Sequence, residues 1–387
     1  MKKIFLLVML SFVLAACAQS PNKQFFANDL TAKLSDDPTK QEYPVNPKIT
    51  LAAIGDILIH APVYRDAQTA DGYDFTPMFK KITPYLKEAT LAIANQETMI
   101  GGTDFGLSGY PAFNSPTEVG DALKESGVDV VSIANNHTLD RGEQAINNAL
   151  SHWESIDMTY TGAYKSQKDQ KKLRVVQTEK GIDVAFLSYT YGTNGIPLPS
   201  GKNYLVNLID AQKIKSDITQ ANKQADAVVV SLHFGSEYER MPNRYQKELA
   251  QLMADSGAHV ILGHHPHVLQ PIEMLEGKKG NETLVIYSLG NFISAQEETH
   301  RRIGGILQVE IELDRHDDSI ALNKPSFVPT IVDYEPFADG QAGTKFQVIP
   351  MHETTREIIP DQKETYKEIK DHMSQWLPEL IFPRTSQ

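Results

Sequence analysis

The sequence has a single cysteine, Cys17, among its 387 residues, so no disulfide can form within the chain. It also lacks an excess of positive charge, because 49 acidic residues outnumber 37 basic ones and the formal net charge is −12. Without a basic stripe to meet phosphates we expect no nucleic-acid partner, and the same charge disfavours tight adhesion to anionic lipid headgroups. The sequence has no internal repeat and no second apolar run that could span a membrane.

The first residues have the pattern of a secretory signal. Lys2 and Lys3 precede an apolar stretch over 4–14, which is too short to span a bilayer as a permanent helix. Small residues then lead to Cys17 in a box that resembles the cleavage box of bacterial lipoproteins. This resemblance implies that Cys17 becomes the lipidated first residue of an exported protein at the extracytoplasmic face of the cell membrane. The alternative is an ordinary signal peptide with a stray cysteine.

The chain is expected to consist of four parts. Residues 1–17 form the signal peptide with its lipobox, and residues 18–47 are polar and aperiodic, as in a flexible tether. Residues 48–293 carry the motifs described below and are long enough to bury a large core. Residues 294–387 form a β-rich extension that ends in a helix.

The part over 48–293 repeats one arrangement, in which a short apolar run ends in polar residues. Alternation of such runs with helical stretches predicts an α/β protein with a largely parallel or mixed sheet. Ligands bind beyond the carboxyl ends of the strands in such sheets. Strands are predicted over 48–54, 91–94, 128–134, 184–187, 227–232, 259–262 and 284–287, and helices over 76–87, 116–126, 142–155, 210–224 and 243–256. Beyond these, strands are predicted over 303–313, 326–332 and 346–351, and a helix over 365–376.

Three histidines follow the strand predicted over 259–262, namely His264, His265 and His267. Imidazole is the commonest metal ligand in proteins, and the spacing of His265 and His267 allows two imidazoles to leave one turn towards one centre. A polar loop with solvated histidines is the alternative reading. The other strand ends decide between these readings, because they offer matching ligands.

Those ligands are a carboxylate, an amide and a further imidazole at separate strand ends. Asp56 and Glu97 each follow an apolar run, and His233 ends the most strand-like run of the chain. Asn136 could bind a cation through its amide oxygen; the alternative for the Asn135-Asn136 pair is a helix N-cap before Gly142, with one asparagine for each role. Such a mixed set suits Mn, Fe, Zn or Ni, and the absence of cysteine ligands argues against a structural zinc site.

The motifs in their order resemble the CapA family of capsule (poly-γ-glutamate) synthesis proteins, which resembles the calcineurin-like metallophosphoesterases in fold. The resemblance implies a layered αββα sandwich with two divalent metal ions. It rests on Gly55-Asp56, Asn95-Gln96-Glu97, the segment from Ala134 to Gly142, His233-Phe234-Gly235-Ser236-Glu237-Tyr238, the segment from Gly263 to Pro271, and Tyr287-Ser288-Leu289-Gly290-Asn291-Phe292.

Carried over residue by residue, the resemblance implies that one metal is held by Asp56 and His267 and the other by Asn136, His233 and His265. Glu97 would take the place of the bridging carboxylate. His137 would protonate the leaving oxygen, and Asp140 would orient it. The superfamily pattern has Asp-x-His at the first strand, whereas this chain has Asp56-Ile57-Leu58, so His60 is a possible substitute as a metal or substrate ligand. His264 has no role in this scheme and is expected to tolerate replacement.

These readings predict a membrane-tethered, exported protein of capsule polymer biosynthesis with a two-metal, hydrolase-like site. Its substrate would be a phosphoester or an anionic polymer, and the resemblance implies membrane subunits of capsule polymer synthesis as partners. The alternative is a non-catalytic subunit that binds metal or polymer within the synthesis complex. A solute-binding lipoprotein is a third class, but it predicts two lobes with a hinge, whereas here the ligands are spread over all the strand ends.

Overall fold

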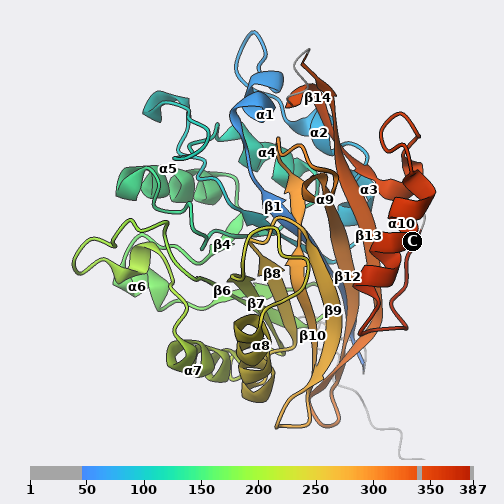
Figure 1. Cartoon of the computed structure of the whole chain (residues 1–387). Helices are drawn as coiled ribbons and strands as arrows, with labels where there is room; N and C mark the ends of the chain where they lie inside the picture. The colour runs from blue at the N-terminus through green and yellow to red at the C-terminus, as the bar shows by residue number, and fades with distance from the viewer. Residues whose placement is uncertain (1–45, 338–341, 384–387) are drawn as a thin grey trace, which may run out of the picture. The chain divides into compact units, whose positions relative to one another are not determined.

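Two β-sheets form the centre of the computed structural model, which describes residues 46–337 and 342–383 (Figure 1). The predicted signal peptide, Cys17 and nearly all of the predicted tether therefore lie outside the described residues. The first sheet has eight strands in the order β14-β13-β12-β1-β2-β3-β4, with β11 paired to β1, and the second has six in the order β5-β6-β7-β8-β10-β9.

The strands of the first sheet are β1 (Lys48–Ile57), β2 (Leu91–Gln96), β3 (Val130–Ser132), β4 (Thr159–Thr161), β11 (Asn291–Ile293), β12 (Ile303–Asp314), β13 (Ser319–Pro336) and β14 (Ala342–Pro350). Those of the second are β5 (Arg174–Gln177), β6 (Asp183–Thr190), β7 (Ala227–His233), β8 (Val260–His264), β9 (Leu269–Glu276) and β10 (Glu282–Leu289). The helices are α1 (Ala61–Asp66), α2 (Thr76–Phe79), α3 (Thr83–Lys87), α4 (Glu118–Glu125), α5 (Gly142–Ser155), α6 (Gln167–Gln170), α7 (Ala211–Ala221), α8 (Arg244–Ser256), α9 (Thr299–Arg302) and α10 (Gln362–Met373), with 3₁₀ turns η1 (Thr103–Phe105), η2 (Asn203–Leu205) and η3 (Met351–Glu353).

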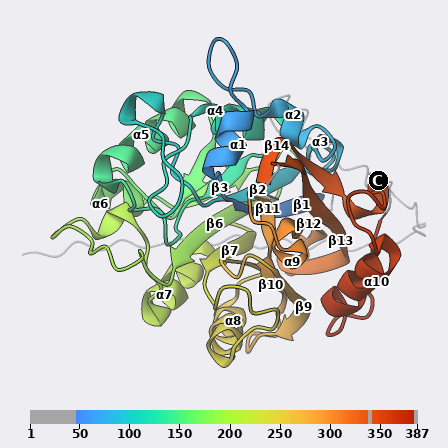
Figure 2. The same ribbon diagram turned by 45° about the horizontal axis from the view of Figure 1, so that its top comes forward.

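Alternation along the strands builds a four-layer arrangement. In β1, Leu51 packs into the core between the two sheets, whereas its neighbour Ala52 faces the core beneath α4 and α5. In β7, Val229 faces the first sheet and Val228 packs against α7 and α8. Successive side chains of a strand point to opposite faces, so each sheet is buried on both sides. The predicted αββα sandwich is confirmed, and Figure 2 shows α2 and α4 above the strands with α7 and α8 below them.

Parallel pairing places the functional strand ends on one rim. Strand β1 pairs in parallel with β2, and β2 with β3, while β6, β7, β8 and β10 form a parallel series in the second sheet. The carboxyl ends of parallel strands meet at the same edge of a sheet. The ends of these two series therefore gather the polar residues that the sequence places after its apolar runs.

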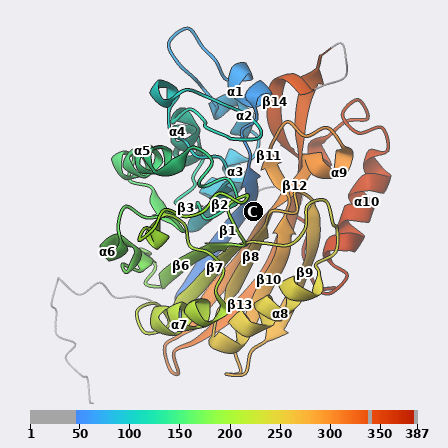
Figure 3. The same ribbon diagram turned by 60° about the vertical axis from the view of Figure 1, so that its left-hand side comes forward.

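The region after residue 293 is β-rich, as predicted, and it continues the first sheet. Strand β12 pairs antiparallel with β1 from Lys48, opposite Glu312, to Ile54, opposite Ile306, and β13 and β14 extend the sheet outward (Figure 3). Helix α10 buries Ile369 and Met373 in the core between the sheets. Among residues 46–337 and 342–383, no helix combines the length and the apolar character needed to cross a membrane.

The predicted helices differ from the structure mainly where proline intervenes. The helix predicted over 76–87 is divided into α2 and α3, each of which has a proline, Pro77 or Pro84, at its start. Proline has no backbone N–H to donate inside a helix, so it starts a new helix more readily than it continues one. The helix predicted over 142–155 is α5 with the same bounds. Helix α8 begins at an Asn243 capping box and ends at Gly257, which has the left-handed conformation.

Candidate metal centre

Two glycines let strands approach closely beside the residues that form the site. A Cβ on Gly55 would lie 2.0 Å from a backbone carbonyl oxygen just before β11, and a Cβ on Gly263 would lie 2.0 Å from a carbonyl oxygen of β10. A side chain cannot fit at either distance, so both positions require glycine. Asp56 and His264 follow these glycines directly and are thereby held at the strand ends, fully or almost fully buried.

One group of candidate ligands consists of Asp56, Glu97 and His267, whose ligand atoms lie within 4.8 Å of one another. His267 Nδ1 is 3.2 Å from Asp56 Oδ2, and His267 Nε2 is 3.7 Å from Glu97 Oε1. Asn291 Oδ1 lies 2.9 Å from His267 Nδ1 and fixes the ring from the side of β11. The structure thus brings the end of β1, the end of β2 and the turn after β8 to one point.

A second group shares the same carboxylate and consists of Glu97, His233 and His265. His233 Nε2 is 3.6 Å from Glu97 Oε1 and 2.7 Å from Asn136 Oδ1. The ring centroids of His233 and His265 are 4.9 Å apart. All six residues predicted as metal ligands therefore lie close together, and Glu97 is common to both groups.

Backbone strain brings the two imidazoles of the turn after β8 into the site. His265 has φ +94° and His267 has φ +57°, both in the left-handed region that residues with a side chain rarely adopt. Such conformations cost on the order of 1–3 kcal/mol each and persist where the surrounding structure imposes them. The strain lets residues two apart in an irregular turn direct their rings into the same buried space.

The buried charges interact strongly. Burial raises the pKa of Glu97 well above its usual range. Burial would also raise the pKa of Asp56, but hydrogen bonds from His264 and His267 hold it well below its usual range. Burial opposes protonation of His267, yet the carboxylates of Glu97 and Asp56 raise its pKa to about 9. Burial lowers the pKa of His265 to about 3, so this imidazole is neutral and able to act as a ligand.

His137 and Asp140 form a pair at the edge of the ligand groups. His137 Nδ1 is 2.7 Å from Asp140 Oδ2, and the same carboxylate oxygen accepts a hydrogen bond of 2.8 Å from the backbone N–H of Phe113. The Phe113 ring meets the His137 ring edge-on at 4.7 Å between centroids. The pair with Asp140 orients the ring, which leaves Nε2 available to exchange a proton with a bound molecule.

Sequence reasoning missed several residues of the site. Glu237, which is exposed, forms a third ligand group with His265 and His267. The Tyr191 ring lies 4.7 Å from that of His265, and Asn194 contacts both Asn136, at 3.2 Å, and the His137 ring. Glu237 follows β7 within the segment from His233 to Tyr238, so its position beyond a strand end could have identified it as a candidate ligand. Tyr191 and Asn194 lie in a loop without such a pattern.

Three interpretations change in the structure. His264 was given no role, but it is buried and its Nδ1 lies 3.2 Å from Asp56 Oδ1. Asn135 does not cap α5: its side-chain oxygen accepts from the N–H of His137 at 2.9 Å, within its own turn. The ligand groups do not include His60, whose Nδ1 meets backbone atoms and whose ring packs on Phe113. A substrate contact for His60 stays a prediction.

The residues present fit divalent cations. Both carboxylate oxygens of Glu97 are buried without a hydrogen-bond partner among the described residues, and His265 Nδ1 is likewise unpartnered. A buried carboxylate normally has donors around it, because an unpaired buried charge costs several kcal/mol. The surrounding atoms are imidazole nitrogens and carboxylate and amide oxygens, which suit Mn, Fe, Zn or Ni. A cation between the two groups would complete the pairing that the protein atoms leave open.

Solved structures match this chain at low sequence identity and with TM-scores below 0.5. A phosphatase from Mycoplasma pneumoniae matches 73% of this chain and 94% of its own, with 13% identity and a TM-score of 0.46. The calcineurin-like phosphoesterase YfkN from Bacillus subtilis matches 84% of this chain and 99% of its own, with 14% identity and a TM-score of 0.43. Likenesses of this size carry no conclusion about activity.

Two sequence relatives have higher sequence identity to this chain than these structures have. The capsule biosynthesis protein CapA of Bacillus anthracis is 32% identical over 279 residues, which is 69% of this chain and 64% of that protein. The PGA biosynthesis protein CapA of Bacillus subtilis (strain 168) is 37% identical over 191 residues, 49% of either chain. The matched region thus spans less than two thirds of each relative. The family model of the bacterial capsule synthesis protein PGA_cap matches residues 50–296, and the chain belongs to this family.

Proposed function

We propose that this chain is an exported, membrane-tethered protein of capsule polymer biosynthesis, with a two-metal, hydrolase-like centre. The role in capsule polymer synthesis is supported by the family membership of the chain and by its relatives from two Bacillus species. We propose that the polymer is of poly-γ-glutamate type. The observation that carries the hydrolase part is Glu97, a fully buried carboxylate that lies between two sets of ligands and has no hydrogen-bond partner among the described residues. Its Oε1 lies 3.6 Å from His233 Nε2 and 3.7 Å from His267 Nε2, beyond hydrogen-bond distance, and a cation bound between these groups would complete the pairing.

In this proposal Asp56 and His267 hold one cation, Asn136, His233 and His265 hold the other, and Glu97 serves both. Divalent cations bound there would supply Lewis acidity and would neutralise the charge that develops on a phosphoryl or carbonyl oxygen. The strained turn after β8 and the hydrogen bonds to Asp56 hold the ligand side chains in place before substrate binds. Such preorganisation lowers the reorganisation needed during the reaction.

His137 is the proposed general acid. Its Nδ1 is held by Asp140 at 2.7 Å, so a proton at Nε2 would be donated to the leaving oxygen or nitrogen of a bound substrate. Phe113 packs against the ring and shields this side of the site from water. The bond to be cleaved is a phosphoester or a γ-glutamyl amide within the capsule polymer, and both leaving groups need a proton from such a donor.

The location and the partners belong to the same proposal. The lipobox-like sequence before Cys17 supports a lipid anchor that holds the chain at the extracytoplasmic face of the membrane. Membrane subunits of capsule polymer synthesis are the proposed partners. The anchor alone would provide membrane attachment, since the net charge of −12 disfavours binding of the folded part to anionic headgroups.

The test measures metal and turnover on the full-length chain. The protein is analysed for bound metal after incubation with Mn²⁺, and is then assayed with bis(p-nitrophenyl) phosphate and with poly-γ-glutamate, whose chain length is followed. The His137→Ala variant should keep its metal and lose turnover by at least about a hundredfold, the usual contribution of a general acid. His152→Ala is the matched control, since His152 also pairs with an aspartate, Asp121 at 3.1 Å, but away from the site.

Each outcome decides a part of the proposal. Absence of bound metal would refute the two-metal centre. Bound metal without turnover of either substrate would refute the hydrolase and favour an assembly subunit that binds metal. An unchanged rate in His137→Ala would remove His137 from the role of acid.

A further inference from the structure

Two adjoining hollows lie away from the metal centre, between α7 on one side and the segment around α6 on the other. Their volumes are about 500 and 540 Å³. They share four lining residues, so they form one elongated groove that we call the α6–α7 groove. The shared residues are Gln170, Lys171, Asn207 and Lys213. None of the candidate metal ligands lines either hollow.

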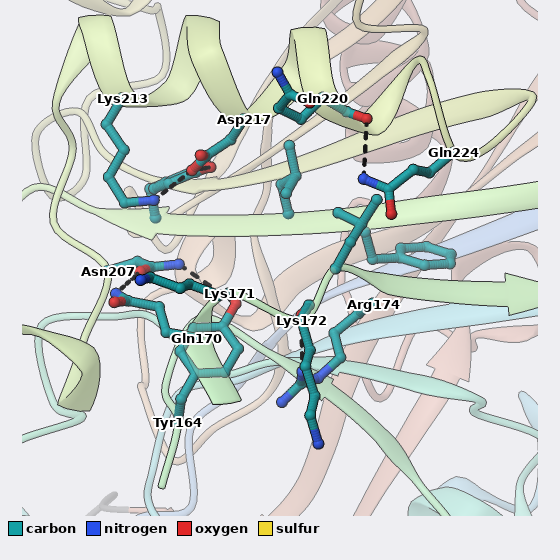
Figure 4. Close-up of a pocket in the computed structure, with 14 residues that line it drawn as sticks. Tyr164, Gln170, Lys171, Lys172, Arg174, Asn207, Lys213, Asp217, Gln220 and Gln224 are labelled. Carbon is teal, nitrogen blue, oxygen red and sulfur yellow. Dashed lines mark hydrogen bonds and ion pairs between the residues drawn. The ribbon is translucent and has the colours of Figure 1, made fainter. Parts of the chain in front are cut away.

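The groove combines an apolar floor with amide side chains on its walls. Leu187 lines the first hollow from β6, and Leu198 lines the second. Figure 4 shows Lys213 and Gln220 on α7 and Gln224 just after it, with Gln170 and Lys171 on the opposite side. The Gln220 carboxamide makes no hydrogen bond with another described side chain. Carboxamides of this kind can donate to and accept from amide groups of a bound chain.

Positive charge exceeds negative charge along the groove. Its lining includes four basic residues and two acidic ones, although the whole chain has a net charge of −12. The acidic residues are already engaged: Asp217 pairs with Lys213 and accepts from the Tyr189 hydroxyl at 2.6 Å, and Asp210 caps α7 by accepting two backbone N–H bonds. Lys213 and Arg174 are thus paired with carboxylates, and Lys171 and Lys172 are the cations that an anionic ligand would meet without an ion-pair partner among the described residues.

Lys171 is the clearest of these cations. Its side chain is exposed and its ammonium forms no ion pair with the residues that the structure describes, whereas Arg174 pairs with Asp169 at 2.8 Å and stacks on Tyr164. Lys171 stands where the two hollows join, and Lys172, which is also exposed, lines the first of them. A chain with a net charge of −12 needs such a local site to bind an acidic polymer.

The groove and the metal centre are connected by one loop. Tyr191 and Asn194, at the beginning of this loop, contact His265 and His137 of the centre, as described above. Asn207, near its end, lines both hollows and hydrogen-bonds Gln170 at 2.8 Å. A polymer bound in the groove would therefore lie against the same loop that borders the metal ligands.

We propose that the α6–α7 groove binds a segment of an acidic polyamide, with carboxylates at Lys171 and Lys172 and amides at the glutamine side chains. The elongated shape fits a chain better than a single small anion. The choice of a polyamide rests on the proposed function, since poly-γ-glutamate carries one carboxylate and one amide in each unit. The groove would hold the polymer against the loop that also borders the metal ligands, without taking part in the chemistry.

The test measures binding of fluorescein-labelled poly-γ-glutamate to the full-length chain by fluorescence anisotropy, with EDTA present. The variant Lys171→Gln with Lys172→Gln should raise Kd about tenfold, because two charge contacts are lost. The matched control is Lys168→Gln with Lys215→Gln, which removes two exposed lysines from the same part of the chain outside the groove. The control should bind like the wild type, and wild-type binding should weaken as salt is raised.

Several results would overturn the proposal. Absence of wild-type binding, or an equal loss in both double variants, would show that the groove is not the site. Competition by free glutamate as strong as that by the polymer would exclude a chain-like ligand, and stronger competition by polyphosphate would exclude carboxylates as the preferred class. Because the assay contains EDTA and follows no turnover, its failure leaves the proposal for the metal centre intact.

Discussion

Replacing Glu97 with glutamine tests whether this buried carboxylate holds the proposed cations. Glu97 belongs to both Asp56–Glu97–His267 and Glu97–His233–His265, in which the ligand atoms lie within 4.8 Å of one another. The substitution changes one oxygen to an NH₂ group and keeps the size of the side chain. If cations bind both groups, this single change weakens both sites at once.

The expected magnitude follows from linkage between binding and folding. Mn²⁺ at about 100 times its Kd stabilises the wild type by about 2.7 kcal/mol. At roughly 2 °C per kcal/mol for a chain of this size, Tm rises by about 5 °C. Loss of the shared carboxylate should weaken binding at least about a hundredfold, more than loss of an outer-shell partner usually does. The same Mn²⁺ concentration then contributes only about 0.4 kcal/mol, a shift of about 1 °C.

Differential scanning fluorimetry of EDTA-treated protein, with and without Mn²⁺, measures both shifts. Without metal, Glu97→Gln should melt close to the wild type, because a neutral amide of the same size replaces a fully buried carboxyl group whose pKa burial raises well above its usual range. Glu273→Gln, in β9 away from the ligands, is the control and should keep the full shift. The role of Glu97 as a cation ligand is refuted if Mn²⁺ does not raise the Tm of the wild type. It is refuted as well if Mn²⁺ raises the Tm of Glu97→Gln as much as that of the control.

Three further changes test the fold around the site. Burial lowers the pKa of His259 to about 4, whereas its pKa in the unfolded chain is about 6.5. The contribution of this group to the free energy of unfolding is therefore complete above pH 6.5 and falls by about 2 kcal/mol as the pH is lowered from 7 to 5. The free energy of unfolding of His259→Asn, measured with urea, should fall by less over the same pH range. An equal fall in the variant and in the wild type would contradict this prediction. Gly263→Ala should destabilise by more than about 3 kcal/mol, because its Cβ would lie 2.0 Å from a backbone carbonyl, whereas Gly192→Ala, with open space around it, should stay within about 0.5 kcal/mol by the same measurement. His264→Ala should cost about 1–3 kcal/mol, since Asp56 stays buried without this donor; a neutral result would restore the expectation that His264 tolerates replacement.

Much of the fold could be predicted because the signals are local. Strands and their ends are marked within a few residues where an apolar run is followed by histidine. This is the case for β7, which ends at His233, and for β8, which His265 and His267 follow. The division of the helix predicted over 76–87 was also readable, since Pro84 lies inside it. The six ligand residues were named from their strand ends and a family resemblance, and the structure brings all of them together.

Other features depend on contacts between distant segments. Strand β12 pairs with β1 and so joins the C-terminal strands to the first sheet. This pairing depends on hydrogen bonds between residues more than 240 positions apart. The roles of Glu237, Asn194 and His264 come from loops and burial that no periodicity records.

The sequence by itself determined which residues can carry the chemistry, since imidazole, carboxylate and amide groups and their positions after apolar runs are properties of the chain. Only the tertiary structure decided how they combine. It places Glu97 between Asp56 and His267 on one side and His233 and His265 on the other, without a hydrogen-bond donor among the described residues for either carboxylate oxygen. It also gathers the lysines of the α6–α7 groove on a chain of net negative charge. The physical reason is that distance and burial, which set the strength of electrostatic interactions, arise only when the two sheets and their helices pack.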